Sequence, residues 1–129
     1  VRRLLDKVYN DREKLIDVRE DQVEGADVVV VSFGITSRVA GAAIDMARAK
    51  GVKVGHLRMI ITWPFPASKI AALAEAVKAF VVPELNMGQM VIEVERAVCG
   101  KAEVISVPHA GGTVHEPEVI LEQIMEAAK

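Results

Sequence analysis

Polar side chains that could do chemistry gather in two short stretches, each directly after a run of apolar residues. In the first, "SFGITSR" at residues 32–38, Gly34 is followed by the hydroxyls of Thr36 and Ser37 and by Arg38. A strand, a glycine turn and a helix start leave free backbone amides at the positive end of a helix dipole, where an anion can bind. No second glycine or lysine stands at the spacing of a dinucleotide-binding or P-loop motif. A plain helix start capped by Thr36 or Ser37 is therefore the alternative.

The second stretch, "VVPELNMGQM" at residues 81–90, reads as a buried strand that ends in a tight turn and a new helix. It places Glu84, Asn86, Gly88 and Gln89 in that turn. Ligands and partners of α/β proteins are met at such strand ends. Glu84 could act as a general base, but no partner for it is visible, and a polar anchor at the strand end is the favoured interpretation.

The remaining reactive side chains complete no catalytic or metal site. His109, His115 and Glu116 could bind zinc only as a set of three, and loop histidines without metal are favoured. Cys99, the single cysteine, lies at a helix end without a neighbouring base, and an iron–sulfur cluster needs four thiolates. Trp63, in "TWPFP", is interpreted as an interface side chain or as a plug at the sheet end. We therefore predict no catalytic residue and no metal ligand in this chain.

The elements that position these residues alternate between buried strands and amphipathic helices. We predict a connecting helix over residues 1–14 and a single α/β domain over residues 15–129. Repeated right-handed crossovers place a mostly parallel sheet between two helix layers. The helix after "SFG" is expected to bury Val39, Ala42, Ala43 and Met46. Strands are predicted at residues 15–20, 28–33, 52–60, 80–85 and 102–108, with helices after all but the first.

Composition excludes several classes of protein. A chain of 129 residues with 51% hydrophobic residues supports one core, which the 4% aromatic content restricts mainly to Val, Ile, Leu and Ala. A net charge of -2, with scattered basic residues, argues against nucleic-acid binding. No apolar run approaches the roughly 20 residues of a membrane span, and a single cysteine fits a reducing compartment, so we expect a cytoplasmic protein. The first residue is Val1 rather than Met, which fits a piece of a longer polypeptide.

Several segments together resemble one family, the α subunits of 2-oxoacid:ferredoxin oxidoreductases, in the domain that follows their pyrimidine-binding domain. The similar segments cover nearly the whole chain from about residue 26 onward, and "PELNMGQM" through "ERAV" is most similar to 2-oxoglutarate enzymes, with branched-chain 2-oxoacid enzymes next. Glu116 departs from the family, in which a threonine often precedes the proline of the last helix. The segments are "ADVVVVSFGITSR", "ARAKGVKVGHLR", "TWPFP", "VVPELNMGQM" and a closing glycine pair before a proline-started helix.

The resemblance implies the fold of transketolase C-terminal domains. This is a three-layer α/β/α sandwich around a five-stranded mixed, mostly parallel sheet, with the first strand antiparallel at an edge. It implies that the strands ending at Phe33 and Leu85 are neighbours and send their connections in opposite directions, at a topological switch point. We therefore expect residues 84–89 to face residues 34–38 across a crevice that another domain or a small anion occupies.

The resemblance also implies a function, that of a structural and docking domain in an enzyme that oxidatively decarboxylates a 2-oxoacid to acyl-CoA and reduces ferredoxin. The family holds thiamine diphosphate between the pyrimidine-binding domain of the same subunit and a β subunit. Those two are the expected partners, with ferredoxin and coenzyme A at the level of the complex. Thiamine diphosphate, Mg and an iron–sulfur cluster are implied there and none on this chain, which is expected to be inactive alone. A free-standing small-anion or nucleotide-binding module is the second hypothesis, and a hydrolase using Cys99 or Glu84 the third.

Overall fold

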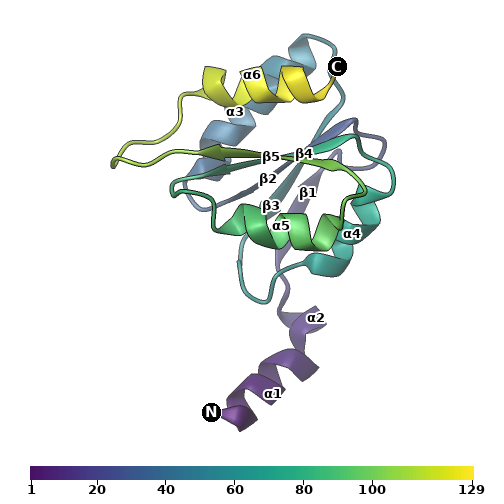
Figure 1. Ribbon diagram of the computed structural model, residues 1–129, viewed down its shortest axis with the longest axis vertical. Coiled ribbons are helices and arrows are strands. Elements are labelled where there is room, and N and C mark those ends of the chain that lie inside the picture. The colour runs from purple at the N-terminus through teal and green to yellow at the C-terminus, as the bar shows by residue number, and fades with distance from the viewer.

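Five strands form one mixed sheet in the computed structural model, which describes residues 1–129 (Figure 1). The strand order is β1-β3-β2-β4-β5. β1 pairs antiparallel with β3 at one edge, and all other pairs are parallel, so the predicted sheet is confirmed. The strands are β1 (Val18–Asp21), β2 (Val28–Phe33), β3 (Val54–Met59), β4 (Ala79–Glu84) and β5 (Glu103–Pro108).

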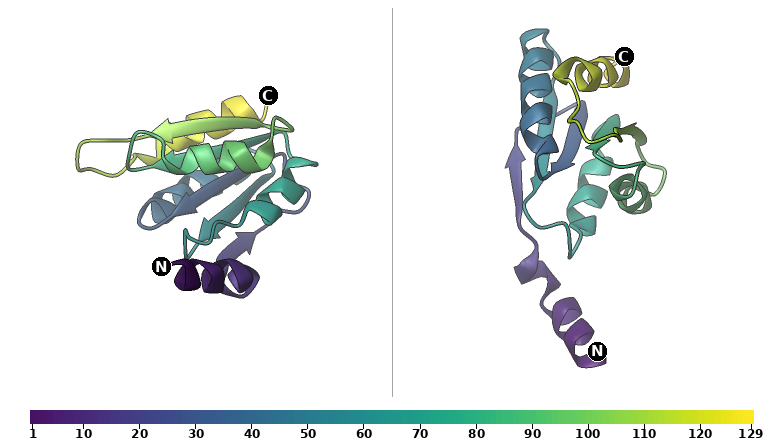
Figure 2. Two further views of the ribbon diagram at one scale, coloured as in Figure 1. Left: turned by 60° about the horizontal axis from the view of Figure 1, so that its bottom comes forward. Right: turned by 90° about the vertical axis from the view of Figure 1, so that its left-hand side faces the viewer.

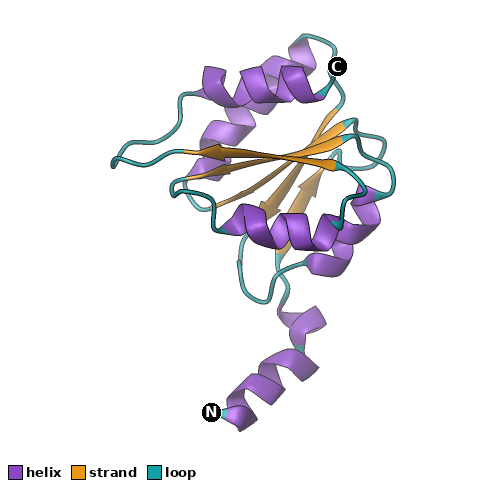
Figure 3. Ribbon diagram, in the orientation of Figure 1, coloured by secondary structure: helices purple, strands orange, loops and turns teal.

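Helices cover both faces of the sheet and complete the three predicted layers (Figures 1 and 3). α3 (Thr36–Ala49) and α6 (Pro117–Ala127) pack together on one face, whereas α4 (Ala67–Ala74) and α5 (Met90–Val98) pack together on the other. β2 and β4 are neighbours, and their connections pass through α3 and α5 on opposite faces. The predicted topological switch point is therefore present between these two strands.

The central valines are buried by both helix layers. Val28 and Val30 belong to the cluster under α3 and α6, while Val29 and Val31 belong to the cluster under α4 and α5. This alternation is the two-residue period of a strand covered on both sides. Each fully buried Val contributes about 1.5–3 kcal/mol through removal of its side chain from water.

The buried stripe of α3 differs from the predicted one. Ala40, Ala43, Ile44 and Ala47 are buried. Of the predicted set, Ala43 belongs to this stripe, Val39 and Met46 are half-buried and pack against the same cluster, and Ala42 is exposed. The predicted face was therefore right in part, because the centre of the buried face lies one position further along the helix and leaves Ala42 in solvent. Small residues let α3 lie close to the sheet.

Two N-terminal helices extend from the body of the protein, as the right-hand view of Figure 2 shows. α1 (Arg2–Asn10) and α2 (Arg12–Leu15) are separated by a break at Asp11, so residues 1–14, predicted as one helix, are helical in two pieces. Neither helix has a buried residue. None of the six helices combines the length and the apolar character that crossing a lipid bilayer requires.

Candidate functional site

Both polar stretches lie where the parallel strands of the sheet end, and this end of the sheet is called here the carboxyl edge. The loops that follow β2, β3, β4 and β5 lie at this edge, and β1 begins there because it runs antiparallel to β3. Open α/β sheets bind ligands at this edge, beside the switch point.

Glu84 is a buried anchor at the end of β4. Its carboxylate accepts hydrogen bonds from the backbone N–H groups of Met90 and Val91, the second at 3.0 Å. These amides belong to the first turn of α5, which has no other side-chain cap and whose dipole favours a negative charge. The backbone carbonyl of Glu84 also accepts a hydrogen bond from the His109 N–H at 2.8 Å. With 0% of the residue exposed, its carboxylate reaches no external substrate, so the geometry suits an anchor rather than a general base.

Asn86 holds the turn that leads into α5. Its side-chain oxygen accepts hydrogen bonds from the N–H groups of Gly88 at 2.7 Å and Gln89 at 3.0 Å, and its amide nitrogen lies 3.4 Å from Glu84 Oε1. This is the turn chemistry that asparagine supports well. Gly88 has φ +102°, in the region that favours glycine. Gln89 is exposed, and its side chain makes no hydrogen bond within the chain. The four residues predicted as one group therefore divide into a structural set and an exposed Gln89.

The first polar stretch lines a pocket of about 580 Å³ between α3 and the edge strand β1, called here the arginine pocket. Gly34, Ser37 and Arg38, all predicted as site residues, lie in its wall. Only one of its nine lining residues is hydrophobic, so it is suited to a polar ligand. The lining consists of Arg19, Asp21, Gly34, Ile35, Ser37, Arg38, Gly41, His56 and Arg58.

A hydrogen-bonded group under this pocket was missed by the sequence analysis. The Ser32 hydroxyl lies 2.7 Å from His56 Nε2 and donates to the Ser37 hydroxyl at 2.9 Å. Burial lowers the pKa of His56 below its ordinary value; Asp21 opposes the shift and Arg48 reinforces it. Ser32 is 0% exposed, so its contact with a histidine builds no accessible nucleophile. Ser32 and His56 are 24 residues apart, and only the register of β2 beside β3 brings them together.

The predicted crevice between residues 34–38 and residues 84–89 is not formed. Among the four pockets of the structure, none is lined by residues from both stretches. The physical reason is that α3 and α5 begin on opposite faces of the sheet, so their first turns point away from each other. Capping by Thr36 or Ser37 was also wrong, because α3 has no side-chain cap and both residues are buried.

Trp63 lies at the carboxyl edge beside the N-terminal helices. Its ring meets that of Tyr9 edge to face, with centroids 6.4 Å apart, and both residues line a small pocket of about 160 Å³. Trp63 is still 58% exposed, so it does not plug the sheet end. Large apolar side chains are exposed both at the carboxyl edge and on the N-terminal helices. At the carboxyl edge these are Ile35, Ile60, Ile61, Trp63, Leu85, Met87 and Val114, and on the N-terminal helices they are Leu4, Leu5, Tyr9 and Leu15.

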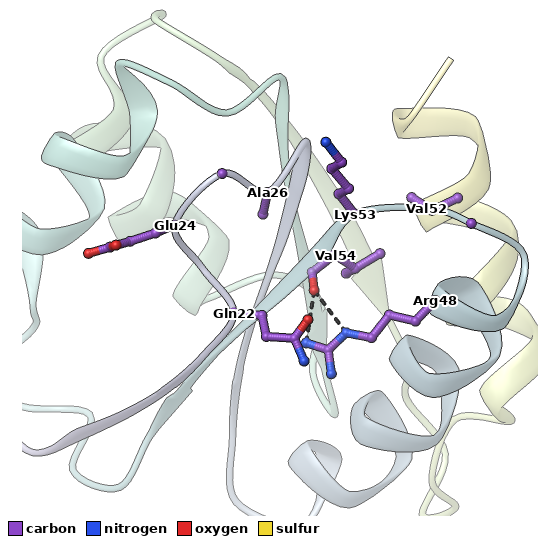
Figure 4. Close-up of a pocket in the computed structure, with 9 residues that line it drawn as sticks. Gln22, Glu24, Ala26, Arg48, Val52, Lys53 and Val54 are labelled. Carbon is purple, nitrogen blue, oxygen red and sulfur yellow. Dashed lines mark hydrogen bonds between the residues drawn. The ribbon is translucent and has the colours of Figure 1, made fainter.

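A second polar pocket, of about 540 Å³, lies at the opposite edge of the sheet (Figure 4). Arg48 crosses it and donates to the Val54 carbonyl through Nε at 3.1 Å and Nη2 at 2.8 Å. The same guanidinium pairs with Asp21 at 2.9 Å. Arg48 thus ties α3 to β1 and β3, and its charge is already neutralised within the protein.

The histidines near the end of the chain are held by the protein itself. His115 is buried and its Nε2 hydrogen-bonds the Val107 carbonyl at 2.6 Å, while His109 Nε2 pairs with the Thr113 hydroxyl at 2.7 Å. The structure contains no group of three His, Cys, Asp or Glu side chains that could hold a metal ion. The donor set therefore does not fit a Mg²⁺ ion or an iron–sulfur cluster, and the expectation that no cofactor resides on this chain stays a prediction.

The fold defines a class, the three-layer α/β/α domains of the transketolase C-terminal type. A solved split-gene transketolase matches with a TM-score of 0.72 and 20% identity over 85% of this chain and 41% of that one, which shows the fold alone. The sequence profile of the pyruvate:ferredoxin oxidoreductase core domain II matches residues 26–120. The chain therefore belongs to the pyruvate:ferredoxin oxidoreductase core domain II family.

Relatives and one further structure agree with this family. The 2-oxoglutarate synthase subunit KorA of Methanothermobacter marburgensis is 42% identical over 97% of this chain and 33% of its own length. The ketoisovalerate oxidoreductase subunit VorB of the same organism is 41% identical over 97% of this chain and 35% of its own length. The solved 2-oxoglutarate:ferredoxin oxidoreductase of Magnetococcus marinus matches with a TM-score of 0.80 and 28% identity, over 93% of this chain and 21% of that one. The chain thus spans about a third of the length of the curated relatives.

Proposed function

We propose that this chain is the structural and docking domain of an α-type subunit in a 2-oxoacid:ferredoxin oxidoreductase, with 2-oxoglutarate as the 2-oxoacid. The observation that carries the proposal is the 42% identity to a 2-oxoglutarate synthase subunit over 97% of the chain. The preference for 2-oxoglutarate over a branched-chain 2-oxoacid is the finer part of the proposal, since a ketoisovalerate oxidoreductase subunit is nearly as similar.

The distribution of apolar surface supports a docking role. Exposed apolar side chains gather at the carboxyl edge, where Met87 is 80% exposed and Trp63 58% exposed. The helix α1 adds Leu4, which is 70% exposed, and projects beyond the body of the domain. Apolar patches of this kind mark interaction sites in proteins that are otherwise well packed. We propose that a pyrimidine-binding domain of the same subunit and a β subunit cover this surface.

The buried side chains at the switch point support the same assignment. Glu84 and Asn86 direct their hydrogen-bonding groups to the start of α5, and Ser32 is fully buried, so none of these three side chains is available for proton transfer to an external substrate. We propose that thiamine diphosphate, Mg and an iron–sulfur cluster reside elsewhere in the complex, where ferredoxin and coenzyme A also react. The alternative of a free-standing anion-binding module has less support, because it leaves the exposed apolar surface without a partner.

An assembly experiment tests the docking role. In the assembled oxidoreductase, Met87→Asp should place a charge in the covered surface and release the domain or its neighbours from the complex, as followed by size-exclusion chromatography with light scattering. Ala76→Asp is the matched control, because it adds the same charge at an exposed position at the opposite edge of the sheet. Intact assembly in the Met87 variant would contradict the proposal.

An activity experiment tests the placement of the chemistry. The purified chain, supplied with 2-oxoglutarate, coenzyme A, thiamine diphosphate and Mg²⁺, should reduce neither ferredoxin nor a redox dye, because it lacks the thiolates of a cluster. Turnover by the chain alone would place catalysis in this domain. In the assembled enzyme, faster turnover of a branched-chain 2-oxoacid than of 2-oxoglutarate would contradict the substrate assignment only.

A further inference from the structure

The arginine pocket carries three cations that nothing in the chain neutralises. The side chains of Arg19, Arg38 and Arg58 take part in none of the ion pairs of the structure. The one carboxylate in the wall, Asp21, is paired with Arg48 at 2.9 Å. Asp45 lies near enough to His56 to act on it electrostatically, but it does not line the pocket. The wall is therefore left with an excess of positive charge.

Two of these arginines stand directly opposite each other in the sheet. Arg19 of β1 is the register partner of Arg58 in β3, so both side chains project from the same face. Like charges at such paired positions destabilise an antiparallel pair of strands. Arg58 is also in register with Ser32, which places the arginine pair beside the start of α3. Fold stability does not account for this pairing, whereas an anion bound between the two guanidinium groups would.

Gly41 gives an independent indication that the pocket must stay open. It lies inside α3, where glycine is less favourable than alanine, and it lines the pocket. A Cβ atom at this position would meet nothing within 4 Å, so helix packing does not require a glycine. Because Gly41 has no side chain, it adds no volume to the pocket that Arg19 and Arg58 also line.

We propose that the arginine pocket binds a small multivalent oxyanion, a molecule with phosphoryl or clustered carboxyl groups, held by Arg19, Arg38 and Arg58. Guanidinium groups match the oxygens of both groups through paired N–H donors. The pocket of about 580 Å³ is large enough for a metabolite rather than a single ion. The site adds ligand binding to the domain and does not depend on which 2-oxoacid the proposed enzyme uses.

Calorimetric titration of the chain with pyrophosphate and, separately, with citrate tests the site. At least one of these probes should bind with one-to-one saturation, and the stronger of the two identifies phosphoryl or carboxyl groups as the preferred chemistry. Arg58→Gln should weaken this binding by about tenfold or more, as expected for the loss of a charge-assisted hydrogen bond. Arg3→Gln removes the same charge from α1, outside the pocket, and should change it less than about twofold. Absence of saturable binding, or equal losses in both variants, would overturn the proposal.

Thermal unfolding separates binding from a structural role. Without an anion, Arg58→Gln should unfold at the same temperature as the parent chain or slightly higher, because it relieves the repulsion with Arg19. At a probe concentration ten times the dissociation constant of the parent, the parent should gain about 5 °C in unfolding temperature and the variant about 1.5 °C or less. A large loss of stability in the variant without an anion would show that Arg58 supports the fold instead.

A steric substitution supplies a second test that leaves the charges in place. Gly41→Leu should fill the pocket and abolish probe binding while α3 remains folded, since leucine is a better helix former than glycine. Ala42→Leu is the matched control, because Ala42 is the exposed neighbour on the same helix and lies outside the pocket. Unchanged binding in Gly41→Leu would overturn the proposal. If the arginines instead pair with acidic residues of a neighbouring subunit, the chain will bind neither probe.

Discussion

Glu84 accepts a hydrogen bond at 3.0 Å from the backbone N–H of Val91, and through this bond the buried end of β4 fixes the first turn of α5. The two residues are seven positions apart, and the carboxylate does for α5 what an N-cap side chain does for other helices. The charge is buried, but it faces backbone donors and the positive end of a helix dipole. This contact ties the switch point of the sheet to the helix that follows it.

Glu84→Gln should lower the free energy of unfolding by about 2 kcal/mol, because an amide nitrogen then faces a helix N–H group and one donor loses its acceptor. Urea unfolding of the chain measures this effect. In an assembled enzyme that still binds thiamine diphosphate, turnover should fall far less than the several orders of magnitude expected for a catalytic acid or base. Such a fall would show that Glu84 is catalytic and would contradict the docking assignment.

Asn86→Ala should cost about 1–2 kcal/mol of stability, since it removes the acceptor for the N–H groups of Gly88 and Gln89. Gln89→Ala is the matched control within the same turn. It should change stability by less than about 0.5 kcal/mol, because the Gln89 side chain is exposed. In the assembled enzyme, Gln89→Ala should weaken assembly or raise the apparent KM without moving the pH profile of turnover. Equal destabilisation by both substitutions would contradict this division of roles.

Features set by local sequence patterns could be predicted. The run of four valines, Val28 to Val31, has the character of a strand buried on both faces, and Pro117 begins α6 where a proline has no amide hydrogen to lose. Resemblance to a family supplied the antiparallel edge strand and the pairing of the strands that end at Phe33 and Leu85, whereas the full strand order came from the structure. The inward face of α3 was predicted only to within one position, because the rotation of a helix about its axis is set by how it packs on the sheet.

The site was predicted only in part because its contacts are set by register and by the faces of the sheet. Ser32 and His56 meet only through the alignment of β2 with β3, and Arg19 faces Arg58 only through that of β1 with β3. The prediction of a crevice between the two polar stretches was wrong for a related reason. Adjacent strands bring residues 34–38 and 84–89 to one edge, but α3 and α5 draw them to opposite faces.

Gly88→Ala should destabilise the chain by about 1–3 kcal/mol and weaken assembly, because Gly88 has φ +102° and a Cβ would lie 3.2 Å from Val91 Cγ1. Gly34→Ala is a graded comparison. Its φ of +60° strains an alanine, but a Cβ there would meet nothing within 4 Å, so a loss of about 1 kcal/mol is expected. Thermal unfolding of both variants measures the difference. If Gly34→Ala loses as much stability as Gly88→Ala, or more, the close contact with Val91 does not explain the effect at Gly88.

His56 should make the stability of the chain sensitive to mild acid. Burial lowers the pKa of His56 in the folded protein, Asp21 and Asp45 raise it, and Arg48 and Arg58 lower it, with burial dominant. As the pH falls below about 6.5, the unfolded chain therefore takes up a proton at this residue before the folded chain does. The contribution of His56 to stability is fully present above that pH and is lost as the pH falls toward the lowered pKa.

His56→Gln keeps a polar side chain beside Ser32 but does not titrate, so it should lose less stability than the parent between about pH 7.5 and about pH 5.5. Urea unfolding at both pH values compares the two proteins. An equal or larger acid-dependent loss in His56→Gln would show that the parent's sensitivity arises from other groups.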